Sequence, residues 1–206
     1  MEENYNQKKE TIRKAAVKIF ASYGFAKTTL DDIANSVGIK KNSLYYYFES
    51  KEQLFNEIIT EELKSIIGRY EEAFRNLNTC EEKVLEFCRI SDTSYCEIAK
   101  LYSVKANAFL EFGIILEKSG HGFIEKTRKI LKSILKEGIK KGEFLKHDVD
   151  ELAEVILDII FAMEFIQIAK YEIEFFNEIK QQKQDEITNY MLKAVKYILQ
   201  GIKNKK

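Results

Sequence analysis

The sequence predicts an all-α protein. Proline is absent from its 206 residues and glycine occurs only nine times, so few residues would interrupt a helix. Hydrophobic residues make up 45% of the chain, which is enough for a buried core. They recur at intervals of three and four residues in the segments described below, the spacing of an amphipathic helix. Helices are therefore expected throughout, and strands are not.

The charge balance excludes a general polyanion-binding protein but leaves room for a local basic face. Lys and Arg number 33, as do Asp and Glu, so the formal net charge is zero. Residues 1–55 hold nine basic and seven acidic side chains, a net of +2, which leaves 24 and 26, a net of −2, for the rest. An excess this small fits a solvated surface as well as a phosphate-binding face.

The longest apolar stretch is too often interrupted to cross a membrane. It covers residues 155–169 and contains Asp158, Glu164 and Gln167. No apolar leader opens the chain. We expect a cytoplasmic protein without a membrane partner.

Three cysteines lie eight residues apart, at Cys80, Cys88 and Cys96. This spacing is typical neither of a disulfide scaffold nor of a CxxC metal site. We expect free thiols with a structural role. A redox sensor is the alternative, and no neighbouring residue favours it.

The N-terminal segments predict three short helices. The first runs from about Gln7 to Tyr23, and Gly24 follows as the left-handed residue that ends a helix. Thr29 and Asp32 form a capping box, so a second helix should begin there. Gly38 then permits a turn into a third helix from about Lys41 to Phe48.

This part of the chain resembles the N-terminal domain of the TetR family of bacterial transcriptional repressors. The resemblance covers about Thr11 to Phe55 and is carried by GFAKTTLDDIANSVGIKKNSLYYYFESKEQLF. In that family a helix-turn-helix is followed by aromatic residues, a Ser-Lys-Glu step and a long linking helix. The resemblance implies a DNA-binding regulator that acts as a dimer and responds to a small molecule.

The start of the third helix holds the expected sequence-reading residues. Lys40, Lys41, Asn42 and Ser43 occupy the end that would enter the major groove, where Asn42 and Ser43 can bond to base edges. One departure from the family is that Lys40 stands where a small capping residue is usual, so the exact start of this helix stays open.

Further expected DNA contacts follow from exposed polar groups. Tyr45 and Tyr46 leave the helix on faces that the core does not need, and a phenol there can donate to a phosphate. Tyr47 fits DNA contact and packing between helices equally well. Lys51 lies in the first turn of the next helix, where backbone amides also favour a phosphate. Thr29 would use its hydroxyl or its backbone amide on a phosphate.

A long helix should join this head to the rest of the protein. Ser50 with Gln53 is a second capping box, and apolar residues continue at helical spacing to about Leu77, a length of ~40 Å. We therefore divide the chain into a DNA-binding domain at 1–50, a connecting helix at 51–77, and a ligand-binding and dimerisation domain at 78–206.

The last domain reads as five helices. Their expected ranges are Glu81 to Tyr95, Glu97 to Lys118, Phe123 to Lys141, a helix capped by Asp148 that ends near Tyr171, and Ile179 to Ile202. The Ser119-Gly120-His121-Gly122 cluster separates the second from the third.

The last two helices are expected to form a homodimer. The fourth is apolar around most of its circumference and needs burial on two sides. One side would meet a second copy, together with Met191, Val195, Ile198 and Leu199 of the last helix. Two recognition helices ~34 Å apart would then read palindromic double-stranded operator DNA. A monomer with a fully buried fourth helix is the alternative.

An effector site would lie in the same domain, as the resemblance implies. Aromatic side chains there suit a small, largely apolar or amphipathic molecule, and they fit an ordinary core as well. The candidate ligand-binding residues are Phe87, Tyr102, Asn107, Phe109, Phe112, Phe161 and Phe165. Glu111, Glu164 and Gln167 are further polar groups that would orient a ligand or lie on the surface.

An enzyme is not expected. His121 and His147 are the two histidines, and neither has metal-ligand spacing to the cysteines. No glycine-rich phosphate loop occurs, so neither a metal nor a cofactor is predicted. The alternative to a ligand-controlled repressor is a ligand-independent dimeric adaptor that binds DNA or protein with the same fold.

Overall fold

The protein is all-helical, as the sequence predicts. The computed structural model describes residues 2–25, 27–101, 122–170 and 179–204. Within these ranges the only bridge between extended segments is an isolated pair, Phe144 with Lys203. The helices are α1 (Glu2–Tyr23), α2 (Leu30–Ser36), α3 (Lys41–Leu44), α4 (Lys51–Phe74), α5 (Cys80–Leu101), α7 (Phe123–Lys140), α8 (Val149–Lys170) and α9 (Gln181–Ile202).

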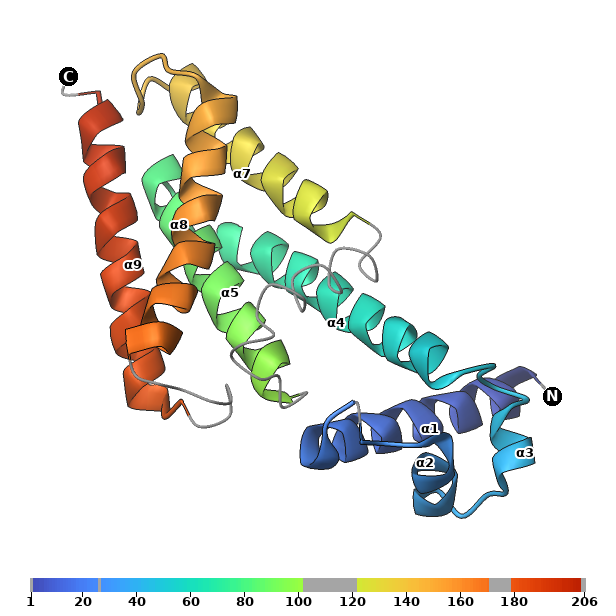
Figure 1. The fold of residues 1–206 in the computed structure, drawn as a ribbon. Coiled ribbons are helices and arrows are strands. Elements are labelled where there is room, and N and C mark those ends of the chain that lie inside the picture. Colours follow the sequence, from blue (N-terminus) through green and yellow to red (C-terminus); the bar gives the residue numbers. More distant parts are fainter. Residues whose placement is uncertain (1, 26, 102–121, 171–178, 205–206) are drawn as a thin grey trace.

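Two groups of helices lie at opposite ends of α4 (Figure 1). The small group is α1, α2 and α3, which we call the head. The large group is α5, α7, α8 and α9, which we call the body, and α5 contacts α4 and each of the other body helices. The N-terminus lies at the head and the C-terminus at the far end of the body.

The head has a core that α4 completes. Ile12 and Phe20 of α1, Ile33 of α2, and Leu44 at the end of α3 are fully buried. Leu54, on the first turn of α4, is buried with them in one continuous cluster. Because three helices this short enclose little apolar surface alone, the start of α4 belongs to the structure of the head.

Two glycines set the turns of the head. Gly24 has φ +78° and donates its N–H to Phe20 O, which ends α1. Gly38 has φ +68° in the turn between α2 and α3. Both values lie in the left-handed region, which a side chain with a Cβ rarely adopts.

The predicted caps at Thr29 and Asp148 are confirmed. The Thr29 hydroxyl accepts from Asp32 N–H at 3.2 Å, and the Asp32 carboxylate accepts from Thr29 N–H at 2.8 Å. Asp148 Oδ1 accepts from the N–H groups of Asp150 and Glu151. These local interactions start helices where the sequence predicted.

The cap of α4 differs in one detail from the prediction. Ser50 Oγ accepts from Gln53 N–H at 3.0 Å, as expected. Gln53 Oε1, however, accepts from Glu49 N–H at 2.6 Å, one residue before the cap. The reciprocal bond of a capping box is thus displaced by one residue.

Several predicted helix ends were wrong. α1 begins at Glu2 rather than near Gln7, and α4 ends at Phe74 rather than near Leu77. The helix expected to run to Phe48 is α-helical only to Leu44, because the N–H of Tyr47 bonds three residues back, to Leu44 O, and closes a tighter turn.

The break predicted between Tyr95 and Glu97 is also wrong. α5 runs without interruption from Cys80 to Leu101 and buries Cys96 and Ile98. No glycine or proline stands at that point, so the backbone has no reason to leave the helix. The rest of the predicted helix to Lys118 and the first three residues of the break that follows it fall outside the described ranges. The last residue of that break, Gly122, has φ +76° and is the N-cap residue of α7.

The C-terminal segment closes the far end of the body. Leu145 N–H donates to Ile202 O at 2.7 Å, and Asn204 N–H donates to Glu143 O at 2.9 Å. These bonds hold the buried Phe144 ring directly over Gly138 of α7.

Among the helices in the described ranges, none combines the length and the apolar character that crossing a membrane requires.

Candidate nucleic-acid interface and ligand cavity

The α2–turn–α3 segment presents the residues expected to read bases. Lys40 is the N-cap residue of α3, with φ −74° and ψ 148°, and its side chain makes no capping hydrogen bond. The short helix is held instead by its backbone and by the buried Leu44. Asn42 and Ser43 lie on its exposed side, free of the core.

Lys41 is paired within the head. Its Nζ lies 2.7 Å from Asp31 Oδ2, and both side chains are exposed. The hydrogen bond to Asp31 and the charge of that carboxylate raise the pKa of Lys41, so the ammonium is charged at neutral pH. An exposed pair of this kind stabilises the fold little and can exchange its partner for a phosphate.

Three tyrosines form a cluster beside α3. The rings of Tyr5 and Tyr47 are stacked with centroids 5.0 Å apart, and Tyr46 packs edge-on against both, at 5.5 and 5.3 Å. Tyr46 remains 74% exposed despite these ring contacts. Tyr45 is also exposed, whereas Tyr47 is half-buried.

Tyr5 was missed by the sequence reasoning. It lies seven residues, or two helical turns, before the buried Ile12, so it continues the inner face of α1. That periodicity would have found the residue, although not its contact with Tyr47.

The hydroxyl and the backbone N–H of Thr29 are both bonded within the cap of α2. Its hydroxyl donates to Asp32 Oδ2 at 2.7 Å and its N–H donates to the same atom at 2.8 Å. These two bonds, the hydroxyl first, lower the pKa of Asp32. A phosphate contact by Thr29 would therefore have to replace a bond to Asp32.

The Lys51 ammonium is directed into the protein. It donates to Phe25 O at 2.8 Å and to Thr28 O at 3.0 Å, and it lies 4.2 Å from the centroid of the Phe25 ring. These contacts pin the α1–α2 turn to the first turn of α4. The charge of the Lys51 side chain is thus engaged within the head.

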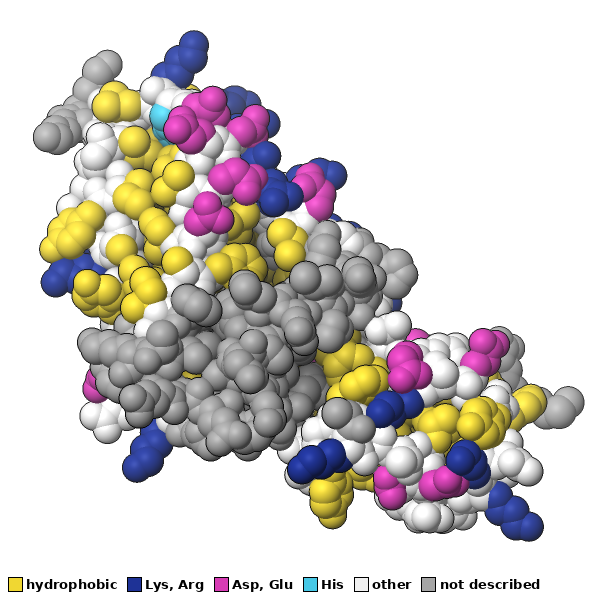
Figure 2. All heavy atoms as spheres, viewed as in Figure 1, with side chains coloured by type: hydrophobic (Ala, Val, Ile, Leu, Met, Phe, Trp, Pro, Cys, Tyr) yellow, Lys and Arg dark blue, Asp and Glu magenta, His cyan; other side chains and the backbone are white. Residues whose placement is uncertain are grey.

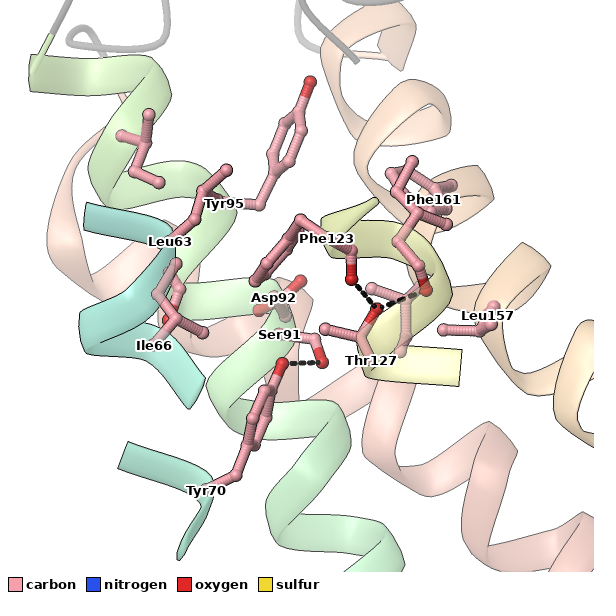
Figure 3. A pocket seen from close by; sticks show the side chains of 14 residues that line it. Leu63, Ile66, Tyr70, Ser91, Asp92, Tyr95, Phe123, Thr127, Leu157 and Phe161 are labelled. Atoms are coloured by element: carbon pink, nitrogen blue, oxygen red, sulfur yellow. Dashed lines mark hydrogen bonds between the residues drawn. The ribbon is translucent and has the colours of Figure 1, made fainter. Parts of the chain in front are cut away.

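A cavity of about 60 Å³ lies in the body between α4, α5, α7 and α8 (Figure 3). Its lining is mainly apolar and comprises Leu63, Ile66, Tyr70, Ser91, Asp92, Ser94, Tyr95, Ile98, Phe123, Ile124, Thr127, Leu157, Ile160 and Phe161.

Of the candidate ligand residues, Phe161 lines this cavity. Phe87 does not, because it is fully buried and stacks on the Tyr70 ring at 5.0 Å, which makes it a core residue. Tyr102, Asn107, Phe109, Glu111 and Phe112 fall outside the described ranges, as do the side chains of Glu164, Phe165 and Gln167.

Most polar groups of the lining are satisfied within the protein. Tyr70 and Ser91 share a hydrogen bond at 2.9 Å, and burial raises the pKa of Tyr70. Thr127 Oγ1 donates to the backbone of its own helix, to Ile124 O at 2.8 Å (Figure 3). Asp92 differs: Oδ2 accepts from the Thr188 hydroxyl of α9, and Oδ1 has no hydrogen-bond partner in the part of the chain that the structure describes.

Asp92 was not among the predicted site residues. It lies four residues after Cys88 and eight after Val84, both fully buried, so the sequence places a carboxylate on the apolar stripe of α5. That position in an apolar stripe is the feature of the sequence that could have identified Asp92 as a site residue.

The outward face of α8 and α9 carries apolar side chains, which Figure 2 shows gathered over these helices. On α8, Val155 is 42% and Ile166 is 50% exposed, and on α9, Tyr190 and Tyr197 are each 62% exposed. The expected dimer residues of α9 were wrong in part: Met191, Val195 and Leu199 are buried against their own chain. Ile198 is half-buried.

Sequence comparison connects the chain with known regulators. A model of the family described as "Bacterial regulatory proteins, tetR family" matches residues 12–58. The HTH-type transcriptional repressor KstR2 of Rhodococcus jostii is 32% identical over 145 residues, which cover 67% of this chain and 68% of that protein. The uncharacterized HTH-type transcriptional regulator YhgD of Bacillus subtilis is 28% identical over 162 residues, covering 77% and 83%.

Solved structures share the fold over nearly the whole chain. A transcriptional regulator from Cytophaga hutchinsonii superposes with a TM-score of 0.75 at 25% identity, over 94% of this chain and 97% of that one. Two more distant structures hold ligands. FadR from Bacillus subtilis, in complex with stearoyl-CoA, has a TM-score of 0.67 at 22% identity and covers 89% and 95%. A putative regulator from Saccharomonospora viridis, in complex with choline, has a TM-score of 0.72 at 14% identity and covers 93% and 97%.

Proposed function

Since the chain belongs to the TetR family of bacterial regulatory proteins, we propose that it is a transcriptional repressor that binds operator DNA as a homodimer and releases it when a small effector binds. The observation that carries the DNA-binding part is the exposed start of α3. Asn42 and Ser43 are exposed on α3, and the buried Leu44 anchors this helix to the core of the head. This arrangement suits insertion of α3 into the major groove.

The proposed contacts divide into base-reading and positioning groups. Asn42 and Ser43 read base edges, while Lys40 and Lys41 add charge beside them. Tyr45 and Tyr46 donate their hydroxyls to phosphates. Their exposure supports this role, because a large aromatic ring left in water gains nothing there.

Three other candidates take indirect roles. Tyr47 supports Tyr46 through the ring contact with Tyr5. Lys51 contributes its backbone amide at the start of α4, since its side chain is bonded within the head. Thr29 reaches a phosphate only by exchanging one of the two bonds that it donates to Asp32.

The proposed dimer joins the α8–α9 faces of two copies. Val155, Ala162 and Ile166 follow one another at helical spacing on the exposed side of α8, and Tyr190 and Tyr197 do so on α9. An apolar face on adjacent helices is stabilised when a second copy covers it, and a twofold axis presents two heads to a palindrome. The proposed interface thus uses the outward residues of the last two helices.

The effector would act through α4. In the proposed division, residues 1–50 form the DNA-binding domain, 51–77 the connecting segment, whose helix ends at Phe74, and 78–206 the ligand-binding and dimerisation domain. Leu63, Ile66 and Tyr70 of α4 line the cavity, and Leu54 of the same helix is part of the head core. A ligand that favours a different position of α4 changes the spacing of the two heads and lowers DNA affinity. That structures of this fold include complexes with stearoyl-CoA and with choline supports the binding of a small molecule.

A gel-shift assay with the promoter region beside the protein's own gene tests the proposal. The folded protein should retard one fragment there against excess nonspecific DNA, and sedimentation should show a dimer. A matched variant, Ser43→Ala with Asn42→Ala, should lose this preference and keep the fold. A folded dimer that binds no fragment specifically would exclude the repressor and favour the protein-binding adaptor.

A further inference from the structure

The Asp92 carboxylate is buried in the body with half of its hydrogen-bonding capacity unused. The residue is fully buried on α5, and Figure 3 shows it among the side chains that line the cavity. Oδ2 accepts from the Thr188 hydroxyl on α9. Oδ1 has no hydrogen-bond partner, and no ion pair with Asp92 is found within the described ranges.

Leaving this oxygen unpaired is costly. A buried polar group without a partner typically costs about 1–3 kcal/mol, and more when it is charged. A carboxylate on an apolar helix face is therefore an unusual choice for a residue whose only task is packing. Ser94 reinforces the point, because its hydroxyl is buried at the same cavity and also has no partner in the described part of the chain.

The rest of the wall is apolar and aromatic. Tyr95, Phe123 and Phe161 border the same space, and the polar groups of Tyr70 and Thr127 are already bonded within the protein. From the described lining residues, the cavity thus offers the free carboxylate oxygen of Asp92, the hydroxyl of Ser94 and an apolar volume bordered by aromatic rings. A ring-lined site also suits a cation, which is attracted to aromatic faces.

We propose that the effector of this cavity is an apolar molecule with a protonated nitrogen, whose N–H group donates to Asp92 Oδ1. This rests on the proposed function only in calling the ligand an effector. An ammonium supplies both the missing donor and the missing opposite charge, and a charge-assisted bond is about twice as strong as a neutral one. A carboxylate ligand should bind more weakly than an amine, because it would bring a second carboxylate into the same buried site.

Matched small probes test this on the purified full-length protein. Benzylamine, benzyl alcohol and benzoate share one ring and differ in the group that would meet Asp92. Calorimetric titration should rank them in that order, with benzylamine at least about tenfold tighter than the alcohol. A ranking led by the alcohol or by benzoate, or no binding of benzylamine, would overturn the proposal.

Two variants locate the effect. Asp92→Asn keeps the size and an oxygen that can accept from Thr188, and it should abolish the preference for the amine. Asp158→Asn removes an exposed carboxylate of α8 on the helix that supplies Leu157, and it should leave the ranking unchanged. A preference that survives Asp92→Asn contradicts the assignment. The wild-type ranking decides by itself if Asp92→Asn does not fold.

The same samples separate this inference from the proposed function. If the wild-type protein retards its promoter fragment but does not bind benzylamine, the regulator stands and the cationic effector is wrong. If the amine ranking holds and no DNA is bound specifically, the cavity chemistry stands and the repressor is wrong.

Discussion

Replacing Lys51 with methionine distinguishes a structural role of this residue from a phosphate contact. The ammonium makes two hydrogen bonds, to Phe25 O and Thr28 O, and lies over the Phe25 ring. Methionine keeps most of the apolar stem and removes both bonds. Charged hydrogen bonds contribute about 1.5–3 kcal/mol each when buried, and Lys51 is only half-buried, so we expect a total loss of about 2 kcal/mol.

Thermal unfolding and the salt dependence of DNA binding are the two measurements. A loss of that size lowers the Tm of a protein of this length by ~4–8 °C. Lys27→Met is the matched control, because Lys27 is an exposed lysine of the same segment. It should leave the Tm unchanged.

The slope of log K for DNA binding against log salt concentration distinguishes a structural role of Lys51 from a phosphate contact. Each phosphate contact contributes about 0.9 to that slope, so a lysine that meets DNA lowers it by about 1 when removed. We expect Lys51→Met to weaken DNA binding on all sequences with an unchanged slope, because the turn before α2 loosens. An unchanged Tm together with a slope reduced by about 1 would refute the structural reading.

Three further predictions concern other parts of the chain. Tyr46→Phe should weaken binding similarly on all DNA sequences, whereas Asn42→Ala should change base preference, with about 1–3 kcal/mol lost at one position in a binding-site selection assay. A changed base preference for Tyr46→Phe and a uniform loss for Asn42→Ala would mean that α3 is rotated in the groove. Gly138→Ala should cost about 1–3 kcal/mol in urea unfolding, because its Cβ would collide with a buried ring, while Gly68→Ala, with open space around it, should stabilise α4 by about 0.5–1 kcal/mol. Burial, with nearby carboxylates, raises the pKa of Cys80 to about 11 from 9.0, so the stability contributed by its neutral thiol is complete below pH 9.0 and is lost as the pH rises through about 11. Iodoacetamide at pH 9 should therefore modify Cys80 at least tenfold more slowly in the native than in the unfolded protein, and equal rates would contradict its burial.

The head could be predicted in detail because its signals are local. The bond between Thr29 and Asp32 joins residues three apart, and a left-handed turn at Gly24 needs only one residue of the right type. Tyr5 escaped prediction because its partner, Tyr47, is far away in sequence. A pattern of spacings shows that a residue faces inward, and it does not show what the residue meets.

The body was harder to predict for the same reason. Met191 and Val195 were correctly read as apolar faces of the last helix, but periodicity does not say whether a stripe is buried by its own chain or by a second copy. Asp92 was overlooked because a single carboxylate in an apolar stripe is invisible to a count of hydrophobic residues. Its partner Thr188 lies on α9, which only the folded chain brings near.

α4 links the two halves of the proposed mechanism because it is held at both ends. Lys51 bonds it to the α1–α2 turn, and Tyr70, bonded to Ser91, fixes it to α5 beside the cavity. A helix of 24 residues is ~36 Å long and has one unbroken hydrogen-bond ladder, so a displacement at the cavity is carried to the head rather than absorbed between them. A ligand that reaches Asp92, one residue after Ser91 on α5, therefore acts next to the point where α4 is anchored.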